Sequence, residues 1–244
     1  MSTFLHDDLE LHFDDHAALT AGAPPVLLLH GFFGAASDWT PHLRRFGDGR
    51  VVVPDLRGHG RSATPRGAFT HRDAAGDVLA LLDALGVERC RAVGLSGGGN
   101  VLLHLATRAP GRLESMVLVS ATTHFPEPAR AIQRGFTLDA LGAAENARLR
   151  ERHVRGEAQL AALLASARGF ADSVDDLAFG PAELGAIRAR TLVVAGDRDP
   201  FYPVELAVGL YRGIADAALW VVPEGGHVPV GRTFFDEARA WLGR

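Results

Sequence analysis

Short apolar runs alternate with longer amphipathic stretches along this chain. Several of the runs are apolar at every position, which is typical of strands covered on both faces, as in a parallel sheet. The runs predict strands at Leu9–Phe13, Val26–Leu29, Val51–Val53, Ala92–Leu95, Met116–Val119, Leu192–Val194 and Leu219–Val222. The stretches between them predict helices at Ser37–Arg45, Thr70–Gly86, Gly98–Arg108, Val204–Tyr211 and Thr233–Leu242. Because strands and helices alternate, we expect an α/β fold with a mainly parallel sheet and helices on both faces.

One segment breaks this alternation. Between residues 123 and 189 the sequence predicts no strand, and helical stretches at Ala143–Val154 and Glu157–Ala167 follow each other. The residues His124–Pro128 lead into them and are stiffened by two prolines. We interpret the segment as a helical insertion before the last two strands, which divides the chain into a core of residues 1–123 and 190–244 and an insertion of residues 124–189.

The composition removes several kinds of chemistry. The 244 residues include 25 basic side chains, all of them arginine, so a Schiff-base lysine, a pyridoxal-phosphate anchor and a P-loop lysine are excluded. The formal net charge is −4 at pH 7, and we therefore expect neither nucleic acid nor anionic lipid as a partner. All apolar runs are shorter than the ~20 residues that span a bilayer, so we expect no membrane segment.

The cysteine and histidine content predicts no metal site. Cys90 is the single cysteine, which excludes an intramolecular disulfide and a cysteine-rich metal site. His6, His12 and His16 lie among aspartates, but their spacing fits no ligand pair on a helix, and a polar edge hairpin explains them better. The first eight residues lack the cationic start and apolar centre of a signal peptide. Together these features predict a reduced, cytoplasmic location.

The strongest local motif is Gly94–Gly99, which places Ser96 between a predicted strand and a predicted helix. A serine on such a sharp turn takes a strained conformation, and its small neighbours allow the turn to close. Its hydroxyl then stands clear of the backbone, close to a helix N-terminus that favours developing negative charge. The pattern predicts that Ser96 is a nucleophile.

A serine nucleophile needs a base, and the base needs an acid that orients it. His227 follows the last predicted strand on a glycine-rich loop, and two aspartates, Asp197 and Asp199, follow the strand before it. The C-terminal ends of parallel strands meet at one edge of the sheet, where ligands bind. We therefore expect Ser96, one of these aspartates and His227 to act together.

An acyl-transfer intermediate also needs two hydrogen-bond donors for its oxyanion. The predicted strand Val26–Leu29 is followed by a His-Gly-Phe sequence, so the backbone N–H of Phe32 can point at the same edge of the sheet. The N–H of Gly97 follows the serine directly. The sequence therefore predicts an oxyanion hole formed by Phe32 and Gly97.

These motifs together resemble the α/β-hydrolase fold superfamily over nearly the whole chain. Five segments match in the family's order: His30–Gly34 resembles the oxyanion loop, Asp55–Ser62 the turn after the next strand, Gly94–Gly98 the nucleophile elbow, Gly196–Asp199 the acid loop and Gly225–His227 the histidine loop. The resemblance implies that Asp199, rather than Asp197, is the acid of the triad. It also implies that residues 124–189 form a cap over the active site, and that His30, Asp55 and Arg57 support its rim.

Departures from related enzymes narrow the expected class. Epoxide hydrolases and haloalkane dehalogenases of this fold use an aspartate where Ser96 stands, and hydroxynitrile lyases of this fold rely on a lysine. The elbow also differs from the Gly-Gly-Ser-Trp-Gly sequence of prolyl iminopeptidases. Cofactor-free perhydrolases often place proline in the oxyanion loop, where this chain has Phe33. Among the aromatic residues, we expect Phe33, Trp39 and Phe125 to line the substrate pocket.

The expected function is therefore serine hydrolysis of a small, mostly apolar carboxylic ester, with thioesters or lactones as further substrates. The reaction would pass through an acyl-enzyme on Ser96 and would need no metal or organic cofactor. Two alternatives remain open at this point: perhydrolysis or carbon–carbon bond hydrolysis with the same triad, and a slow or non-catalytic ligand receptor of the same fold. The partner we expect is a small molecule, and the sequence predicts neither its identity nor the oligomeric state.

Overall fold

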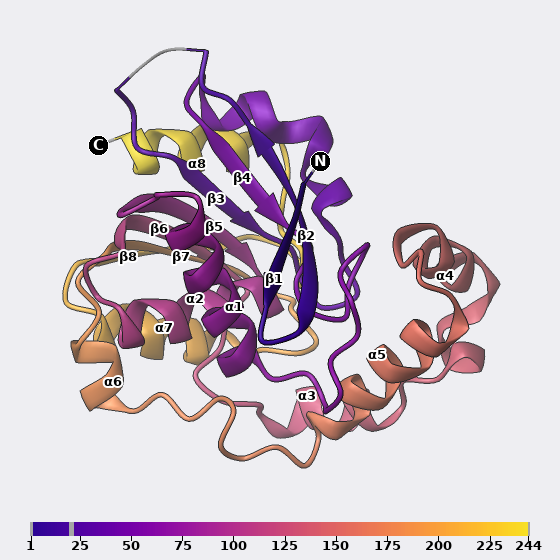
Figure 1. Cartoon of the computed structure of the whole chain (residues 1–244). Helices are drawn as coiled ribbons and strands as arrows, with labels where there is room; N and C mark the ends of the chain where they lie inside the picture. Colours follow the sequence, from indigo (N-terminus) through magenta and orange to yellow (C-terminus); the bar gives the residue numbers. More distant parts are fainter. Residues whose placement is uncertain (1, 20–21, 244) are drawn as a thin grey trace.

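Eight strands form one mixed sheet in the computed structural model, which describes residues 2–19 and 22–243 (Figure 1). The strands are β1 (Ser2–His6), β2 (Leu9–His16), β3 (Val26–Leu29), β4 (Val51–Pro54), β5 (Cys90–Leu95), β6 (Leu113–Val119), β7 (Arg190–Gly196) and β8 (Ala217–Val222). Their order in the sheet is β1-β2-β4-β3-β5-β6-β7-β8. The β1–β2 and β2–β4 pairs are antiparallel and every other pair is parallel, which confirms the predicted mainly parallel sheet.

Helices cover both faces of this sheet, as the sequence predicts. Leu27 and Leu29 of β3 face one hydrophobic cluster, while Leu28 faces the other, and all three side chains are fully buried. The first cluster lies under α1 (His71–Ala84), α2 (Gly97–Arg108) and α7 (Val204–Gly213). The second lies under the 3₁₀ helices η1 (Ala36–Asp38) and η2 (Thr40–Phe46) and under α8 (Arg232–Gly243).

The remaining helices lie in the long connection between β6 and β7, where the sequence predicts a helical insertion. They are α3 (Glu127–Arg134), α4 (Leu138–Arg152), α5 (Glu157–Gly169) and α6 (Pro181–Gly185). Figure 1 shows α3, α4 and α5 together on one side of the sheet, as a layer separate from the helices of the core. We call α3, α4 and α5 the cap helices. The boundaries of the core at residues 123 and 190 stay a prediction.

Two predicted helices differ from the structure. The helix predicted near Ser37–Arg45 is present as two 3₁₀ helices, η1 and η2, on either side of Trp39 rather than as one continuous helix. The Asp38 carboxylate accepts a hydrogen bond from the Ala35 N–H (3.1 Å) and closes the first short turn. In α4 the chain turns out of helical geometry at Gly142, whose φ is 76°. The regular part of α4 therefore starts near the predicted residue 143, while a preceding turn capped by Thr137 was not predicted.

Candidate active site

Ser96 lies on a strained turn between β5 and α2. Its φ of 50° and ψ of −114° belong to a region that residues with a side chain rarely adopt. Close backbone approaches hold the turn: a Cβ on Gly94 would lie 2.5 Å from the carbonyl oxygen of Gly98, and one on Gly98 would lie 2.5 Å from that of Leu29. Only glycine fits at these two positions, and the packed turn presents the Ser96 side chain at the C-terminal edge of the sheet.

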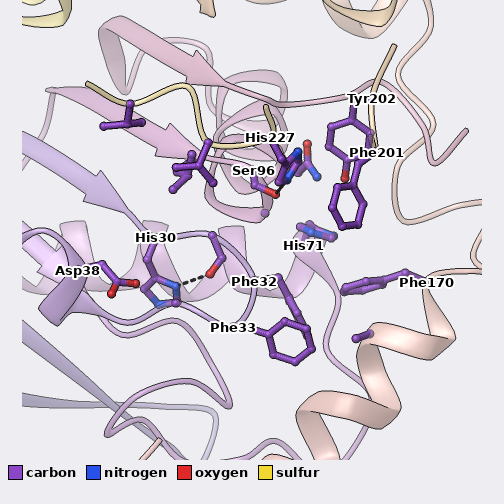
Figure 2. A pocket seen from close by; sticks show the side chains of 18 of the residues that line it. His30, Phe32, Phe33, Asp38, His71, Ser96, Phe170, Phe201, Tyr202 and His227 are labelled. Atoms are coloured by element: carbon purple, nitrogen blue, oxygen red, sulfur yellow. Dashed lines mark hydrogen bonds between the residues drawn. The ribbon is translucent and has the colours of Figure 1, made fainter. Parts of the chain in front are cut away.

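Two hydrogen bonds connect Ser96, His227 and Asp199. The Nε2 atom of His227 lies 2.8 Å from Ser96 Oγ (Figure 2). Its Nδ1 atom lies 2.8 Å from Asp199 Oδ2. The other oxygen of Asp199 accepts hydrogen bonds from the backbone N–H groups of Phe201 (2.8 Å) and Tyr202 (3.2 Å). An ionised carboxylate only accepts hydrogen bonds, so the imidazole Nδ1–H donates to it and Nε2 offers a lone pair to the serine hydroxyl.

The two loops that carry these residues pack closely together. Gly196 at the end of β7 contacts the backbone of Gly225 so tightly that a side chain would collide with its carbonyl group. The N–H of Arg198 donates a hydrogen bond to the carbonyl oxygen of Gly225 (2.8 Å), which fixes the acid loop against the histidine loop. Of the two candidate aspartates, Asp199 contacts His227, whereas Asp197 is exposed.

The backbone amides of Phe32 and Gly97 lie side by side near the serine. A Cβ on Gly97 would lie 3.1 Å from the backbone nitrogen of Phe32, so the two residues face the same small space. Gly97 is the first residue of α2, and its N–H therefore has no acceptor within the helix. The loop takes its shape from Phe33, which has a φ of 66°, and from the hydrogen bond between the Gly34 N–H and the Gly31 carbonyl (2.9 Å).

His30 and Asp55 hold the oxyanion loop in place through hydrogen bonds to backbone groups. The Leu56 N–H donates to His30 Nε2 (3.0 Å), so the other ring nitrogen carries the proton and donates to the Gly31 carbonyl (2.8 Å). Burial lowers the pKa of His30 and keeps its ring neutral. The Asp55 carboxylate accepts a hydrogen bond from the Ala36 N–H (2.7 Å). These contacts match the supporting positions that the resemblance implies.

Arg57 occupies a more distant position. It pairs with Asp77, with Nε 2.6 Å from Oδ2 and Nη2 2.8 Å from Oδ1, and Asp77 also contacts His6 of β1 at 2.8 Å. This network connects the turn after β4 to helix α1 and the edge hairpin. Arg57 therefore stabilises the core rather than the active-site loop.

A cavity of about 570 Å³ opens beside Ser96 and reaches under the cap helices. Its wall includes charged and amide side chains, among them Asp38, Asn100, Gln133, Glu145 and Arg152. It also includes nine aromatic side chains from both the core and the cap: Phe32, Phe33, Trp39, Phe125, Phe136, Phe170, Phe201, Tyr202 and Phe235. All three aromatic residues predicted for the pocket are in this wall. Phe33 contacts Phe136 edge to face, with ring centroids 5.3 Å apart, whereas Trp39 and Phe125 are almost fully buried. A cavity of this size and polarity suits a small, mostly apolar molecule.

His71, Asp176 and His153 are polar residues in or next to the site that were not predicted from the sequence. His71 lies in the cavity wall and pairs with Asp176, which comes from the segment between α5 and α6. His153 ends α4 and contacts the carbonyl oxygen of Phe33 at 3.1 Å. Each pair joins residues more than a hundred positions apart, and no local motif accompanies them. The one signal available was the placement of His71 directly after Thr70, the predicted start of a helix.

Neither a metal-binding cluster nor a membrane-spanning helix occurs among the described residues. Among residues 2–19 and 22–243, no group of three or more His, Cys, Asp or Glu side chains is arranged to hold a metal ion. In the same residues, no helix has both the length and the apolar character needed to cross a membrane.

Comparison with known proteins shows the protein family to which this chain belongs. Residues 26–239 match the alpha/beta hydrolase family. The chain is 34% identical over 251 residues to "Putative carbamate hydrolase RutD" from Variovorax paradoxus (strain S110), an alignment that covers 90% of each protein. It is 33% identical over 235 residues to the 2-hydroxymuconate semialdehyde hydrolase of Pseudomonas sp. (strain CF600), covering 83% of this chain and 80% of that protein.

A solved structure adds a third relative. The thermophilic esterase from Thermogutta terrifontis superposes with a TM-score of 0.75 at 26% identity, covering 96% of this chain and 93% of the esterase. The protein is thus a hydrolase with a mainly parallel sheet and cap helices between β6 and β7. It belongs to the alpha/beta hydrolase family, as the sequence motifs indicate.

Proposed function

We propose that this protein is a serine hydrolase that cleaves small, mostly apolar carboxylic esters through an acyl-enzyme on Ser96. The observation that carries the proposal is the continuous hydrogen-bonded chain from Ser96 through His227 to Asp199, with both separations at 2.8 Å, at the floor of an aromatic cavity. A nucleophile, a base and an orienting acid at these distances are the arrangement that acyl transfer requires.

In the first half of the proposed reaction, Ser96 Oγ attacks the ester carbonyl carbon and His227 Nε2 takes the hydroxyl proton. The carbonyl oxygen becomes an oxyanion and receives hydrogen bonds from the N–H groups of Phe32 and Gly97. The bond to the alkoxy group then breaks, and His227 returns its proton to the leaving alcohol. Asp199 holds the ring in the required tautomer and stabilises the transient imidazolium.

In the second half, water takes the place of the alcohol. His227 removes a proton from water as it attacks the acyl carbon, the same two amides hold the second oxyanion, and the acid is released as Ser96 recovers its proton. Every proton and electron pair in both halves is carried by the substrate, water and these residues. The proposed cycle therefore requires no metal or organic cofactor.

The residues that line the cavity indicate which side chains would contact the substrate. Phe201 and Tyr202 contact the His227 ring, with ring centroids 4.6 Å and 5.3 Å from it. They therefore line the part of the cavity in which the leaving group would take its proton from His227. Phe33 and Trp39 line the cavity on the side of the oxyanion loop, and Phe125 lines it near the cap. We propose all three as substrate-contacting residues.

Hydrolysis of a carbon–carbon bond is the second candidate. Its support is the 33% identity to a 2-hydroxymuconate semialdehyde hydrolase over most of both chains. Such a reaction would use the same nucleophile and oxyanion donors but would expel a carbon leaving group, which His227 would protonate. The two candidates differ in their products, not in the residues they use.

Hydrolysis of 4-nitrophenyl esters from acetate to decanoate, with wild type and Ser96→Ala in parallel, tests the proposal. We expect turnover with a short- to medium-chain optimum, and loss of at least a thousandfold in kcat for Ser96→Ala. A wild type that is inert on every ester but cleaves a 2-hydroxy-6-oxo-dienoate would favour the second candidate. Retained turnover in Ser96→Ala would contradict both.

A further inference from the structure

A second histidine–aspartate pair, His71–Asp176, faces the cavity beside the first. Asp176 Oδ2 lies 2.7 Å from His71 Nδ1 and also accepts the His71 backbone N–H (3.0 Å), while Oδ1 accepts the Arg72 N–H (3.2 Å). His71 is the first residue of α1, so the carboxylate holds both the ring and the helix end that carries it. The His71 ring is therefore held at Nδ1 by a carboxylate, as the His227 ring is by Asp199.

The partners of Asp176 define which nitrogen of His71 carries a proton. Burial raises the pKa of Asp176, but a hydrogen bond from the His71 side chain, electrostatic attraction to that side chain and hydrogen bonds from two backbone amides outweigh burial and hold that pKa at about 2. The carboxylate is thus ionised and only accepts hydrogen bonds, so His71 Nδ1–H donates to it. Nε2, on the opposite side of the ring, remains free to bind another group.

The free nitrogen points at the oxyanion donors. His71 lines the cavity, and its Nε2 lies 3.6 Å from the position that a Cβ on Gly97 would occupy. Figure 2 shows the His71 ring between the Ser96–His227 pair and the ring of Phe170. Among the residues that the structure describes, none forms a hydrogen bond with this Nε2 atom.

Three phenylalanine rings pack against His71. Its ring contacts Phe69, Phe125 and Phe170, with centroids 5.2 Å, 6.0 Å and 5.1 Å away, and the whole residue is only 1% exposed. The Nε2 atom is accessible from the cavity, so a ligand that enters the cavity can supply the partner that the described residues do not. A polar atom held in place by a buried carboxylate between aromatic rings therefore points to a polar group on the ligand.

We propose that His71 Nε2 binds a hydroxyl group on the acyl half of the substrate, close to the scissile carbonyl. The inference rests on the proposed acyl transfer at Ser96. The leaving group must lie beside His227 to receive its proton, whereas His71 lies beside Gly97, one of the proposed oxyanion donors. When the ring is neutral its Nε2 carries a lone pair, which accepts from a hydroxyl and offers nothing to an unsubstituted alkyl chain. The substrate class is accordingly a 2- or 3-hydroxyacyl ester.

The test compares methyl butyrate with methyl 2-hydroxybutyrate and methyl 3-hydroxybutyrate, each hydroxy ester as both enantiomers, by proton release at constant pH. The key variant is His71→Asn, because the asparagine amide can still donate to Asp176 while nothing remains at the Nε2 position. His104→Gln is the matched control: His104 Nε2 donates to the Asp176 carbonyl (2.6 Å) but does not line the cavity.

We expect wild type to prefer one hydroxy ester over methyl butyrate by at least tenfold in kcat/KM, because a site built to pair a hydroxyl discriminates against its absence. His71→Asn should lose this ratio and His104→Gln should keep it. Equal rates on all esters in wild type, or a preference that survives in His71→Asn, would overturn the proposal. A preference for monomethyl succinate over the hydroxy esters would also overturn it, since the cavity would then select a carboxylate, bound by Arg152 or a protonated His71, rather than a hydroxyl.

A measurement of ligand binding tests the hydroxyl site independently of the proposed ester hydrolysis. Calorimetry with Ser96→Ala, which cannot form the acyl-enzyme, should show tighter binding of the preferred hydroxy ester than of methyl butyrate. The difference should vanish in Ser96→Ala/His71→Asn. If wild type fails to hydrolyse any ester but this binding difference is present, the ester hydrolase proposal fails and the hydroxyl site stands. If esters are hydrolysed and no binding difference exists, the hydroxyl site fails.

Discussion

The imidazole of His153, at the end of cap helix α4, donates a hydrogen bond from Nε2 to the carbonyl oxygen of Phe33 (3.1 Å), while its Nδ1 accepts one from the Gly60 N–H (2.9 Å). Phe33 follows Phe32, whose amide is a proposed oxyanion donor. One neutral ring thus joins the cap to the loop on which the proposed chemistry depends. The bond from Gly60 requires the neutral form, because protonation of Nδ1 would remove its acceptor.

Acid should therefore destabilise the protein well above the range where carboxylates titrate. Burial lowers the pKa of His153 to about 4, from an ordinary value of 6.5. The unfolded chain binds the proton more readily, so the stabilisation is complete above pH 6.5 and is lost as the pH falls toward 4. The shift corresponds to about 3 kcal/mol. His104, whose pKa burial also lowers to about 4, adds to the loss over the same range.

Urea unfolding between pH 8 and pH 4.5 measures this loss. His153→Gln should be less stable at pH 8, since glutamine cannot form both hydrogen bonds, and its free energy of unfolding should depend less steeply on pH. A free energy of unfolding that stays constant from pH 8 to pH 5 in wild type would contradict the assignment of a neutral buried ring.

Replacement of Asp199 by asparagine tests the orientation of His227. The amide can offer N–H to Nδ1 and so favours the wrong tautomer, with the proton on Nε2 facing Ser96. We expect kcat on the best ester to fall by about 10³- to 10⁴-fold with little change in KM. Asp197→Asn is the matched control on the same loop and should retain wild-type kcat. A loss of less than tenfold for Asp199→Asn would remove Asp199 from the proposed triad.

Gly97→Ala tests the oxyanion donors without touching the serine. The new methyl group would lie 3.1 Å from the Phe32 nitrogen and cover the space the two amides share. Loss of one donor typically costs about 10²-fold or more in kcat, and alanine suits a first helical turn, so we expect lost activity in a stable protein. Gly111→Ala, where a Cβ meets nothing within 4 Å, supplies the control. Wild-type kcat in Gly97→Ala would place the oxyanion elsewhere.

The cap should set the size of the substrate. Phe136 lies between α3 and α4, is only partly buried, and contacts Phe33 (5.3 Å between centroids) and Phe201 (6.5 Å) across the cavity. Phe136→Ala should widen the pocket and move the chain-length optimum to longer esters. Two ester series, one varied in the acyl chain and one in the alcohol, would show which half Phe136 limits. An unchanged optimum in both series would show that Phe136 does not bound the substrate.

The sequence predicts the core of this protein well because its signals are local. The apolar run at Val26–Leu29 coincides with β3, and the glycines around Ser96 identify a turn that only glycine permits. The order of serine, aspartate and histidine at strand ends could likewise be read directly, because parallel strands place those ends at one edge. Each of these motifs reflects contacts between residues that are close together in the sequence.

The parts that could not be predicted depend on distant contacts. Strand β1 pairs through alternating half-exposed residues and carries too little apolar pattern to detect. The η1 and η2 turns replace a predicted helix because Pro41 and the Asp38 cap favour short 3₁₀ turns around Trp39. Asp176 has no sequence motif of its own, and its pairing with His71 arises only when the cap connection folds back onto α1.

The most direct test of the central claim is mass spectrometry of the intact protein after rapid acid quench during turnover of 4-nitrophenyl butyrate. The proposed mechanism predicts a transient species heavier by one butyryl group, with the adduct on the peptide that contains Ser96 and absent from Ser96→Ala. Steady ester turnover with no adduct at any quench time, together with activity retained in Ser96→Ala, would contradict the claim that Ser96 forms an acyl-enzyme.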